Sequence, residues 1–509
     1  MNIPNRSFPV FLALIIAAGF SFAFLPPIKF LMNFSNDDSF FYIKTAYNFS
    51  IGYGSTFDLI NPTNGYHPFW FLILSLYFLI INFFTSFSPD VYFRFVVLLQ
   101  YGISVLTLYF VYKSFNILRA DSKKTFLLFL VAFLIVVFTR DFGLETQLLC
   151  LLYSALLYCK VEETYLNRSL LILKLILISL LFLTRIDFLL TVVPAIIIGD
   201  FSITKKHERK RLVVSYVVTL LVISLTLFCL NKLFFGHFLT ISASIKSSFP
   251  EILFFQNFSM LFQPGYLTNH FLKFALIFIA LLIFLISFRK GNTNSSNYKI
   301  KLFLFGTCAG TLIFLMLNLA FNKQGIREWY VTFPIFTALL LLFFTLNIAR
   351  KYYIIQICLT VFCFAVYFYL TRIAYSKWDS SYDYAIKLKD LTGPEDRIFQ
   401  MDMSGIVGFF SERKIINGDG LINSFEYWNY ICNNNLENYL EDKKIKFYST
   451  HSKDAIIDPI NFTDKIYSNN FGGYPFTFPV SDLVFKMPFS YNHVVNREKG
   501  EWYLFRIKN

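Results

Sequence analysis

The stretch SNDDSFFYIK, residues 35–44, follows an apolar run at 8–32 that is long enough to cross a membrane. It places two adjacent carboxylates, Asp37 and Asp38, where the chain has just left the lipid. Apolar side chains then recur at helical spacing, so we expect a short amphipathic helix along the membrane surface, begun by Asn36 or Asp37. One short polar side chain is enough for a cap. The second carboxylate therefore calls for another role, such as catalysis, because a charge beside the hydrocarbon boundary is unfavourable.

The apolar residues outside this stretch come in long blocks. Hydrophobic residues make up 56% of the 509-residue chain and charged residues 15%, which is typical of a polytopic α-helical membrane protein. The eleven predicted spans are residues 8–32, 67–84, 91–112, 125–138, 144–159, 169–199, 212–234, 271–288, 301–321, 331–348 and 352–371. A turn at TRID, residues 184–187, would divide 169–199 and make twelve elements. We interpret the first run as a retained membrane helix, since no small-residue cleavage site follows it.

The formal charge of +14 is concentrated in short links between apolar runs, which favours cytoplasmic loops over a nucleic-acid surface. The basic links at 204–211, 289–301 and 349–353 predict that the polar tail, 372–509, lies on the outer side of the membrane. Eleven spans and a cytoplasmic N-terminus satisfy this orientation. The basic link at 113–124 then falls outside, against the positive-inside rule, unless an N-terminal segment is re-entrant or too short to span.

The chain divides into a transmembrane part, 1–371, with its first outside loop at 33–66, and the tail, 372–509. The tail has the size of a separate soluble domain and mixes strand-like with helical runs, so we expect an extracytoplasmic α/β or α+β domain. Six of the seven cysteines lie in or at the ends of apolar runs. This distribution predicts neither a disulfide framework nor a metal cluster.

Several ionisable residues stand at predicted membrane boundaries. His67 lies in a turn-rich segment, 54–70, and is either structural or a phosphate partner. Arg185 and Arg327 each stand close in sequence to a carboxylate, with which a local salt bridge is one interpretation. The other interpretation groups them with Lys246, which lies among Ser and Thr hydroxyls, as a pocket for a lipid-linked phosphate.

Six segments, in chain order, resemble the GT-C superfamily of membrane glycosyltransferases that use polyprenyl-phosphate-linked sugars. The matching pieces are DDSFFYIKTAYNFSIGYGSTFDLINPTNGYHPFW (37–70), DFGLETQL (141–148), LTRIDFLL (183–190), FFGHFLTISASIK (234–246), REWYVTFP (327–334) and DMSGIVGFFSERKIINGDGLINSFEY (402–427). The first and last resemble a bacterial and archaeal branch that includes proteins similar to mycobacterial arabinofuranosyltransferases. The first pattern is fairly specific for the superfamily and does not indicate the sugar.

The resemblance implies an inverting transfer of a sugar from a polyprenyl-phosphate donor to a glycan, glycolipid or protein on the outer side of the membrane. Asp37 would be the general base for the acceptor hydroxyl, with Asp38 as its neighbour or substitute. Lys246, Arg327 and Arg185 would bind the donor phosphate. The further substrate-binding residues expected from the matching segments are His67, Asn64, Tyr66, Glu145 and Tyr330.

Cofactors and alternative functions stay open at this stage. Some members of the superfamily use a divalent metal, but no compact set of His, Asp and Glu predicts one here. A nucleotide-sugar site is not expected, because no G-x-G-x-x-G loop is present. The segment NGDGLIN, 417–423, either faces the site or forms a turn within the tail. Two other classes are a transporter or flippase for a lipid-linked saccharide and a non-catalytic partner in envelope assembly.

Overall fold

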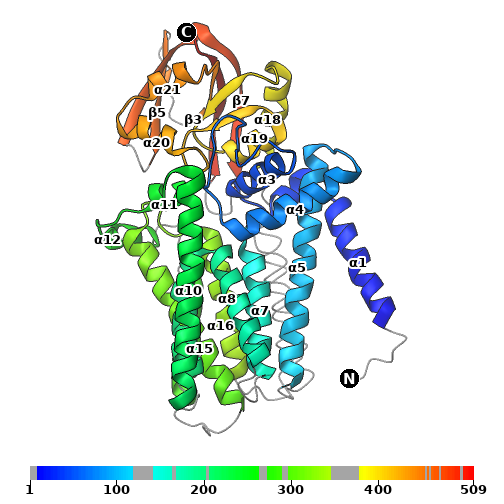
Figure 1. The fold of residues 1–509 in the computed structure, drawn as a ribbon. Coiled ribbons are helices and arrows are strands. Elements are labelled where there is room, and N and C mark those ends of the chain that lie inside the picture. Colours follow the sequence, from blue (N-terminus) through cyan, green and yellow to red (C-terminus); the bar gives the residue numbers. More distant parts are fainter. Residues whose placement is uncertain are drawn as a thin grey trace.

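The computed structural model describes residues 8–117, 142–162, 168–201, 206–262, 272–288, 296–345, 378–452, 456–457, 460–468, 472–492 and 497–508. A bundle of helices carries a sheet-containing domain at one end, drawn at the top of Figure 1. We call residues 378–508 the tail domain. The predicted spans at 125–138 and 352–371, and the predicted boundary at 372, lie outside the described residues.

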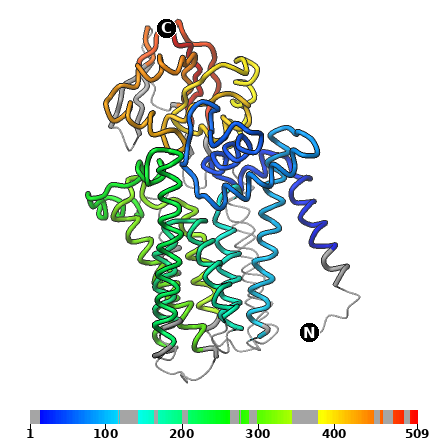
Figure 2. The backbone as a smooth tube through the Cα atoms, viewed as in Figure 1, coloured from blue at the N-terminus to red at the C-terminus, as the bar shows by residue number. Residues whose placement is uncertain are grey.

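The bundle is long enough to cross a membrane. Its main helices run side by side in Figures 1 and 2, and α1 (Phe8–Phe24) leans against α5. The main helices are α5 (Pro89–Ile117), α7 (Thr146–Glu162), α8 (Arg168–Thr184), α10 (Lys206–Phe235), α14 (Leu272–Phe288), α15 (Ser296–Phe321) and α16 (Thr332–Thr345). Among the described residues, three segments have the length and composition of membrane spans: Pro89–Phe115, Glu208–Phe235 and Tyr298–Phe321. Several further apolar helices are shorter, and the chain is a membrane protein.

The TRID turn divides the predicted span at 169–199 into two elements. Helix α8 ends at Thr184, and a 3₁₀ turn, η1 (Ile186–Phe188), leads into α9 (Leu189–Ala195) and the π-helical η2 (Ile196–Phe201). The two-element alternative is therefore confirmed. Helix α9 packs against α15 backbone to backbone, because a side chain at Gly306 or Gly310 would begin within 2.7 Å of the α9 carbonyls.

Helix α3 (Asp37–Ser50) forms where the sequence predicts it. Asn36 is its N-cap, and the Asn36 N–H donates to the hydroxyl of Ser39 at 3.2 Å in a capping box. Nine of its fourteen residues are buried, because the helix packs against α4 and against the tail domain. The apolar face of α3 is therefore covered by protein, and its predicted position along the membrane surface stays a prediction.

Helix α4 (Pro68–Phe84), predicted as a membrane span, lies across the tail-side end of the bundle (Figure 1). Just before it, a side chain at Gly65 would begin 2.0 Å from the Leu421 carbonyl oxygen of the tail domain. Just after it, Asp90 at the start of α5 accepts a hydrogen bond of 3.0 Å from Tyr382 of the same domain. Both ends of α4 thus lie beside the tail domain, so this helix does not cross the bundle.

An exposed apolar face runs along α4 and suits the membrane boundary. The exposed large side chains on this helix are Leu72, Leu76, Leu79, Ile80, Phe83 and Phe84. Without α4 as a span, α5 carries Lys113 to the end of the bundle away from the tail domain, where α10 and α15 begin with basic residues (Figure 1). This removes the conflict that eleven spans created for the basic link at 113–124. Hydropathy alone did not distinguish α4 from a membrane span, because its composition is that of a short span.

The tail domain is built on a five-stranded mixed sheet. The strand order is β2-β1-β3-β8-β7; β1 (Arg397–Gln400), β2 (Lys414–Asn417) and β3 (Phe447–Ser452) are parallel, and β8 (Arg497–Arg506) and β7 (Leu483–Asn492) are antiparallel to their neighbours. A second sheet holds β4 (Ile456–Ile457), β5 (Asn461–Ser468) and β6 (Gly472–Pro479). The helices are α18 (Asp379–Leu391), α19 (Ser404–Ser411), α20 (Phe425–Cys432) and α21 (Leu436–Asp442). Helix α19 connects parallel strands β1 and β2, and α20 with α21 connects β2 and β3, which are α/β units.

Candidate functional site

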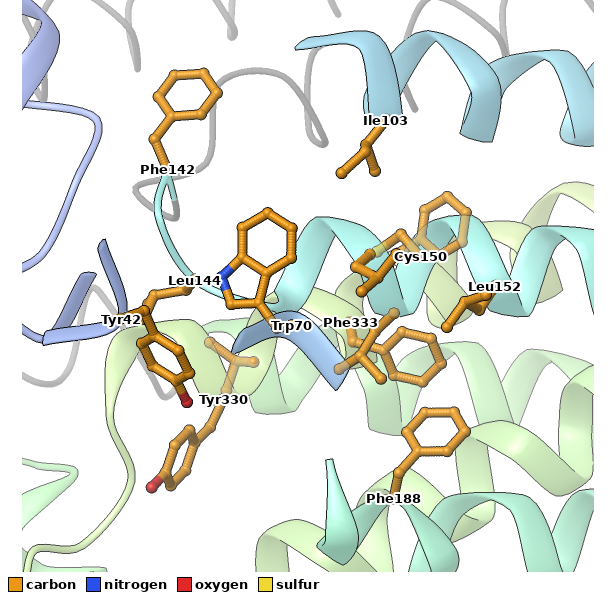
Figure 3. Packing of buried hydrophobic residues seen from close by; sticks show 14 of the residues in the cluster. Tyr42, Trp70, Ile103, Phe142, Leu144, Cys150, Leu152, Phe188, Tyr330 and Phe333 are labelled. Atoms are coloured by element: carbon orange, nitrogen blue, oxygen red, sulfur yellow. The ribbon is translucent and has the colours of Figure 1, made fainter. Parts of the chain in front are cut away.

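A cavity of about 320 Å³ lies where the helical bundle, the first loop and the tail domain meet. Of the ten residues expected in the site, seven line it: Asp38, Tyr66, His67, Glu145, Arg185, Lys246 and Tyr330. The tail domain contributes Leu421 to the lining. In Figure 3, Tyr42 and Tyr330 lie at the edge of the buried apolar cluster with Trp70 beside them, and both tyrosines line the cavity.

The two adjacent acids of α3 point to different places, because successive helical residues are rotated by about 100°. Asp38 lines the cavity. Asp37 accepts hydrogen bonds from the backbone N–H groups of Gly405 at 3.2 Å and Ile406 at 2.8 Å in α19. Burial raises the pKa of Asp37, and the hydrogen bonds from Ile406 and Gly405 oppose that shift. Asp37 therefore does not line the cavity, and its carboxylate is engaged by the tail domain.

Arg185 is held by carboxylates at the cavity wall. Its Nε and Nη2 donate to Asp187 at 2.9 and 2.7 Å, and its Nη1 donates to Glu145 at 2.9 Å. Its guanidinium also lies 4.7 Å from the ring centre of Tyr330. The local salt bridge was one of the two interpretations of this residue, and it is present. Two carboxylates offset the charge of Arg185, so an incoming phosphate would have to compete with both.

Lys246 is a second cation at the same cavity, and its surroundings differ from those of Arg185. It ends the short helix α11 (Ile241–Lys246), whose N-cap Thr240 accepts a hydrogen bond from the N–H of Ala243 at 3.3 Å. Thr240 and Ser242 line the cavity beside it. Within the described part of the chain, no carboxylate forms an ion pair with Lys246.

His67 lies between the first loop and the cavity wall. Its Nε2 is 3.7 Å from the Glu145 carboxylate, and its ring stacks on Tyr42. Burial lowers the pKa of His67, although the Glu145 carboxylate acts against that shift. The imidazole is therefore mainly neutral at pH 7, and it can donate or accept a hydrogen bond without adding charge to the cavity.

Three of the expected residues lie outside the cavity lining: Asp37, Asn64 and Arg327. Buried Asn64 ties the first loop to the segment that carries α11, since it donates to Asn231 at 3.2 Å and accepts from the Ile241 N–H at 2.9 Å. Arg327 is the N-cap residue of η4 (Glu328–Val331). A direct role at the cavity is thus not supported for Asn64 or Arg327, because their side chains are not part of the wall.

Several residues of the lining were not expected from the sequence, among them Tyr42, Asn231 and Trp329. Tyr42 follows Asp38 by four positions, so helical spacing could have placed both on one face of α3. Asn231 could have been identified as a polar residue within the apolar run of α10.

The segment 417–423 is both a turn and a neighbour of the cavity. The Asn423 N–H closes a turn on the Gly420 carbonyl at 3.1 Å, and Gly420 has a φ of +81°, which favours glycine. Leu421 lines the cavity, so the segment borders it, and a role of the segment in the site stays a prediction. Burial raises the pKa of Asp419 to about 7, and the charge of Asp38 contributes to that shift. The acid of α3 and the acid of the tail turn are therefore electrostatically coupled.

Among the described residues, no group of three or more His, Cys, Asp or Glu side chains is arranged to hold a metal ion. Asp38 and Asp419 come from different domains, and Asp187 and Glu145 are occupied by Arg185. The polar groups at the cavity are thus suited to hydroxyl and phosphate contacts more than to metal coordination.

Comparisons with known proteins give weak similarities. A family model described as fusaric acid resistance protein-like matches residues 265–409, less than a third of the chain, and this range runs from the bundle into α19 of the tail domain. The crystal structure of ArnT from Cupriavidus metallidurans, bound to undecaprenyl phosphate, is similar with a TM-score of 0.44 and 11% identity, over 92% of this chain and 98% of that chain. No curated protein matches. A TM-score of this size does not establish a shared fold, and fold alone does not define an activity.

Proposed function

We propose that the chain is an inverting membrane glycosyltransferase that moves a sugar from a polyprenyl-phosphate donor to an acceptor hydroxyl. The observation that carries the proposal is one cavity that brings together Asp38 from the first loop and Lys246 from the end of α11. An acid that can take a proton and a cation that can meet a phosphate are the two charges that this transfer needs. The sequence resemblance to the GT-C superfamily points to the same chemistry.

Asp38 is the general base in this mechanism. Its carboxylate accepts the proton of the acceptor hydroxyl while the hydroxyl oxygen forms a bond to the anomeric carbon. The bond between that carbon and the phosphate oxygen breaks, and its electron pair leaves with the polyprenyl phosphate. Attack from the side opposite the leaving group inverts the anomeric centre. Asp37 takes no proton in this scheme, because its oxygens bind α19.

Lys246 offsets the charge that develops on the leaving phosphate. Its ammonium has no ion-pair partner among the described carboxylates, in contrast to Arg185. Arg185 holds Glu145 and Asp187 in place, and their remaining lone pairs, with neutral His67, are suited to sugar hydroxyls. Of the three residues predicted to bind the donor phosphate, Lys246, Arg327 and Arg185, the proposal keeps Lys246 alone.

The distribution of basic residues supports an orientation for this reaction. The end of α5 and the beginnings of α10 and α15 carry lysines or arginines at the end of the bundle away from the tail domain. By the positive-inside tendency this end is cytoplasmic. The cavity and the tail domain would then lie on the outer side, where the lipid carrier presents its sugar.

Binding of undecaprenyl phosphate to the full chain in nanodiscs tests the assignment. We expect Lys246→Gln to weaken binding about 10- to 100-fold, because one charge-assisted contact is lost. Lys232→Gln is the matched control, since this exposed lysine does not line the cavity and its ammonium contacts only the Gly236 carbonyl and the Phe238 ring among the described residues. Undecaprenol, which lacks the phosphate, should bind weakly to all three proteins. Equal binding of the alcohol and the phosphate would contradict phosphate recognition at the cavity.

A transporter of a lipid-linked saccharide is the second candidate, and the match to the resistance-protein-like model at 265–409 is the observation in its favour. Vesicles that contain the purified chain and a fluorescent polyprenyl-phosphate sugar separate the two. Movement of the lipid between leaflets without glycosylated product would support transport. Product formation that requires Asp38 would support the transferase.

A further inference from the structure

Helix α19 begins at the edge of the tail sheet where parallel α/β proteins bind ligands. It follows β1 directly, and the carboxyl ends of parallel strands together with the helix N-terminus usually receive an anion. Here that anion is Asp37, which accepts from the N–H groups of the second and third residues of α19, Gly405 and Ile406. The binding edge of the tail domain is thus occupied by a side chain of the first loop.

The other end of α19 is bound by the same loop helix. Lys44 lies seven positions after Asp37, two turns along α3 and on the same side. Its ammonium donates to the carbonyls of Gly408 and Arg413, both at 2.7 Å, and lies 4.9 Å from the ring centre of Phe57. An acceptor at the start of a helix and a donor at its end satisfy the backbone groups that lack a partner within the helix.

Two glycines allow α3 and the loop after it to approach α19 this closely. A side chain at Gly405 would begin 2.3 Å from the backbone oxygen of Asp37, and one at Gly408 would begin 2.7 Å from the Phe57 ring. Beside them, Phe40 contacts Phe410 with ring centres 5.2 Å apart. The small and aromatic residues of α19, in the sequence SGIVGFFS, therefore allow it to pack closely against the face of α3 that carries Asp37 and Lys44.

We infer that Asp37 and Lys44 form a two-point clamp on α19, and that this clamp fixes the rotation of α3 that turns Asp38 into the cavity. The role of Asp38 as a base rests on the proposed function; the clamp itself does not. Asp37 and Lys44 are in this view positioning residues. The tail domain belongs to the active site because its docking helix sets the direction of the catalytic acid.

Hydrogen exchange on the full chain tests the clamp without any substrate. We expect Asp37→Ala and Gly405→Ala to accelerate amide exchange in residues 404–411 at least tenfold. Asp38→Asn changes the neighbouring carboxylate only, and Gly102→Ala adds a methyl group where nothing lies within 4 Å, so both should leave that exchange unchanged. If a variant misfolds, Asp37→Asn keeps one acceptor oxygen and should give an intermediate rate. Unchanged exchange in Asp37→Asn, Asp37→Ala and Gly405→Ala would overturn the clamp.

Carbodiimide labelling of carboxylates, read by mass spectrometry, tests the positioning of Asp38. Loss of the clamp in Asp37→Ala should raise the labelling rate of Asp38 at least threefold, while exposed Asp390 on α18 is labelled at its usual rate. Accelerated exchange in α19 with unchanged labelling of Asp38 would overturn the positioning role. Neither measurement needs a sugar donor, so failure of the clamp is distinguishable from failure of the proposed transfer.

Discussion

The two sides of α3 show how adjacent residues with the same chemistry acquire different tasks. On the docking side, Asp37 and Lys44 satisfy the backbone groups at the two ends of α19. On the cavity side, Asp38 and Tyr42 face a space large enough for a ligand. A rotation of one residue along a helix separates a carboxylate that holds two domains together from one that is available for chemistry.

The same contrast separates the two cations of the cavity. Arg185 is buried between two carboxylates, whereas Lys246 faces the cavity with no ion pair to a described carboxylate. Charge at a site is therefore not enough to assign a phosphate ligand. What decides the assignment is whether the charge is already offset by the protein.

Removal of the cavity-side acid should have the largest effect. Asp38→Asn keeps the shape of the side chain but cannot accept the proton, so we expect transfer to slow by about 10²- to 10⁴-fold. The thermal midpoint should not change. The control is Asp402→Asn, at a carboxylate with a side chain 74% exposed. Normal turnover in Asp38→Asn would contradict the assignment of Asp38, on the cavity side of α3, as the general base.

Removal of the paired cation should act on folding more than on binding. Arg185→Gln leaves Glu145 and Asp187 without their shared partner, and a broken buried pair typically destabilises by about 3–5 kcal/mol. We expect a lower thermal midpoint for the purified protein in detergent. Lys246→Gln, on the same cavity, should leave the midpoint unchanged. A stable Arg185→Gln variant with weakened undecaprenyl phosphate binding would reverse the roles given to these two cations.

Loss of the docking-side acid, Asp37, should have a smaller effect, and the effect should be on folding stability. Asp37→Ala removes the acceptor at the start of α19, and loss of a helix cap costs about 0.5–2 kcal/mol of folding stability. The midpoint of thermal unfolding followed by tryptophan fluorescence measures this change. Asp38→Asn serves as the neighbour control. If Asp38→Asn destabilised the chain and Asp37→Ala did not, the two sides of α3 would have been assigned the wrong way round.

The buried docking lysine should make stability depend on pH above neutrality. Burial lowers the pKa of Lys44 from 10.5 to about 7, although Asp58 and Glu412 act against the shift. The unfolded chain then binds a proton more tightly than the folded chain, so this residue makes stability rise between pH 7 and about pH 10. The neutral amine still donates to both carbonyls. Lys44→Met should flatten the rise in thermal midpoint, and an equal slope in both proteins would contradict the buried position of the charge.

Much of the site followed from local sequence, because its residues are polar groups at the ends of apolar runs. The helix after Asn36 and the TRID turn were predicted on that basis, and seven of the ten residues expected in the site line the cavity. The direction of α4 was not, since hydropathy reports burial in lipid without giving an angle. The task of Asp37 was also hidden, because its partners in α19 are more than 360 positions away. The GT-C resemblance ranked Asp37 first, and contact with the tail domain moves the proposal to Asp38.

The division of labour on α3 is tested most directly by a cryo-electron microscopy map of the full chain in nanodiscs with undecaprenyl phosphate bound. We predict the phosphate beside Lys246 in the cavity under Leu421, with the Asp38 carboxylate facing the space next to it. Asp37 should still contact the Gly405 and Ile406 amides. A phosphate bound by Arg185 or Arg327, or a map in which Asp37 has left α19 to face the phosphate, would contradict the account.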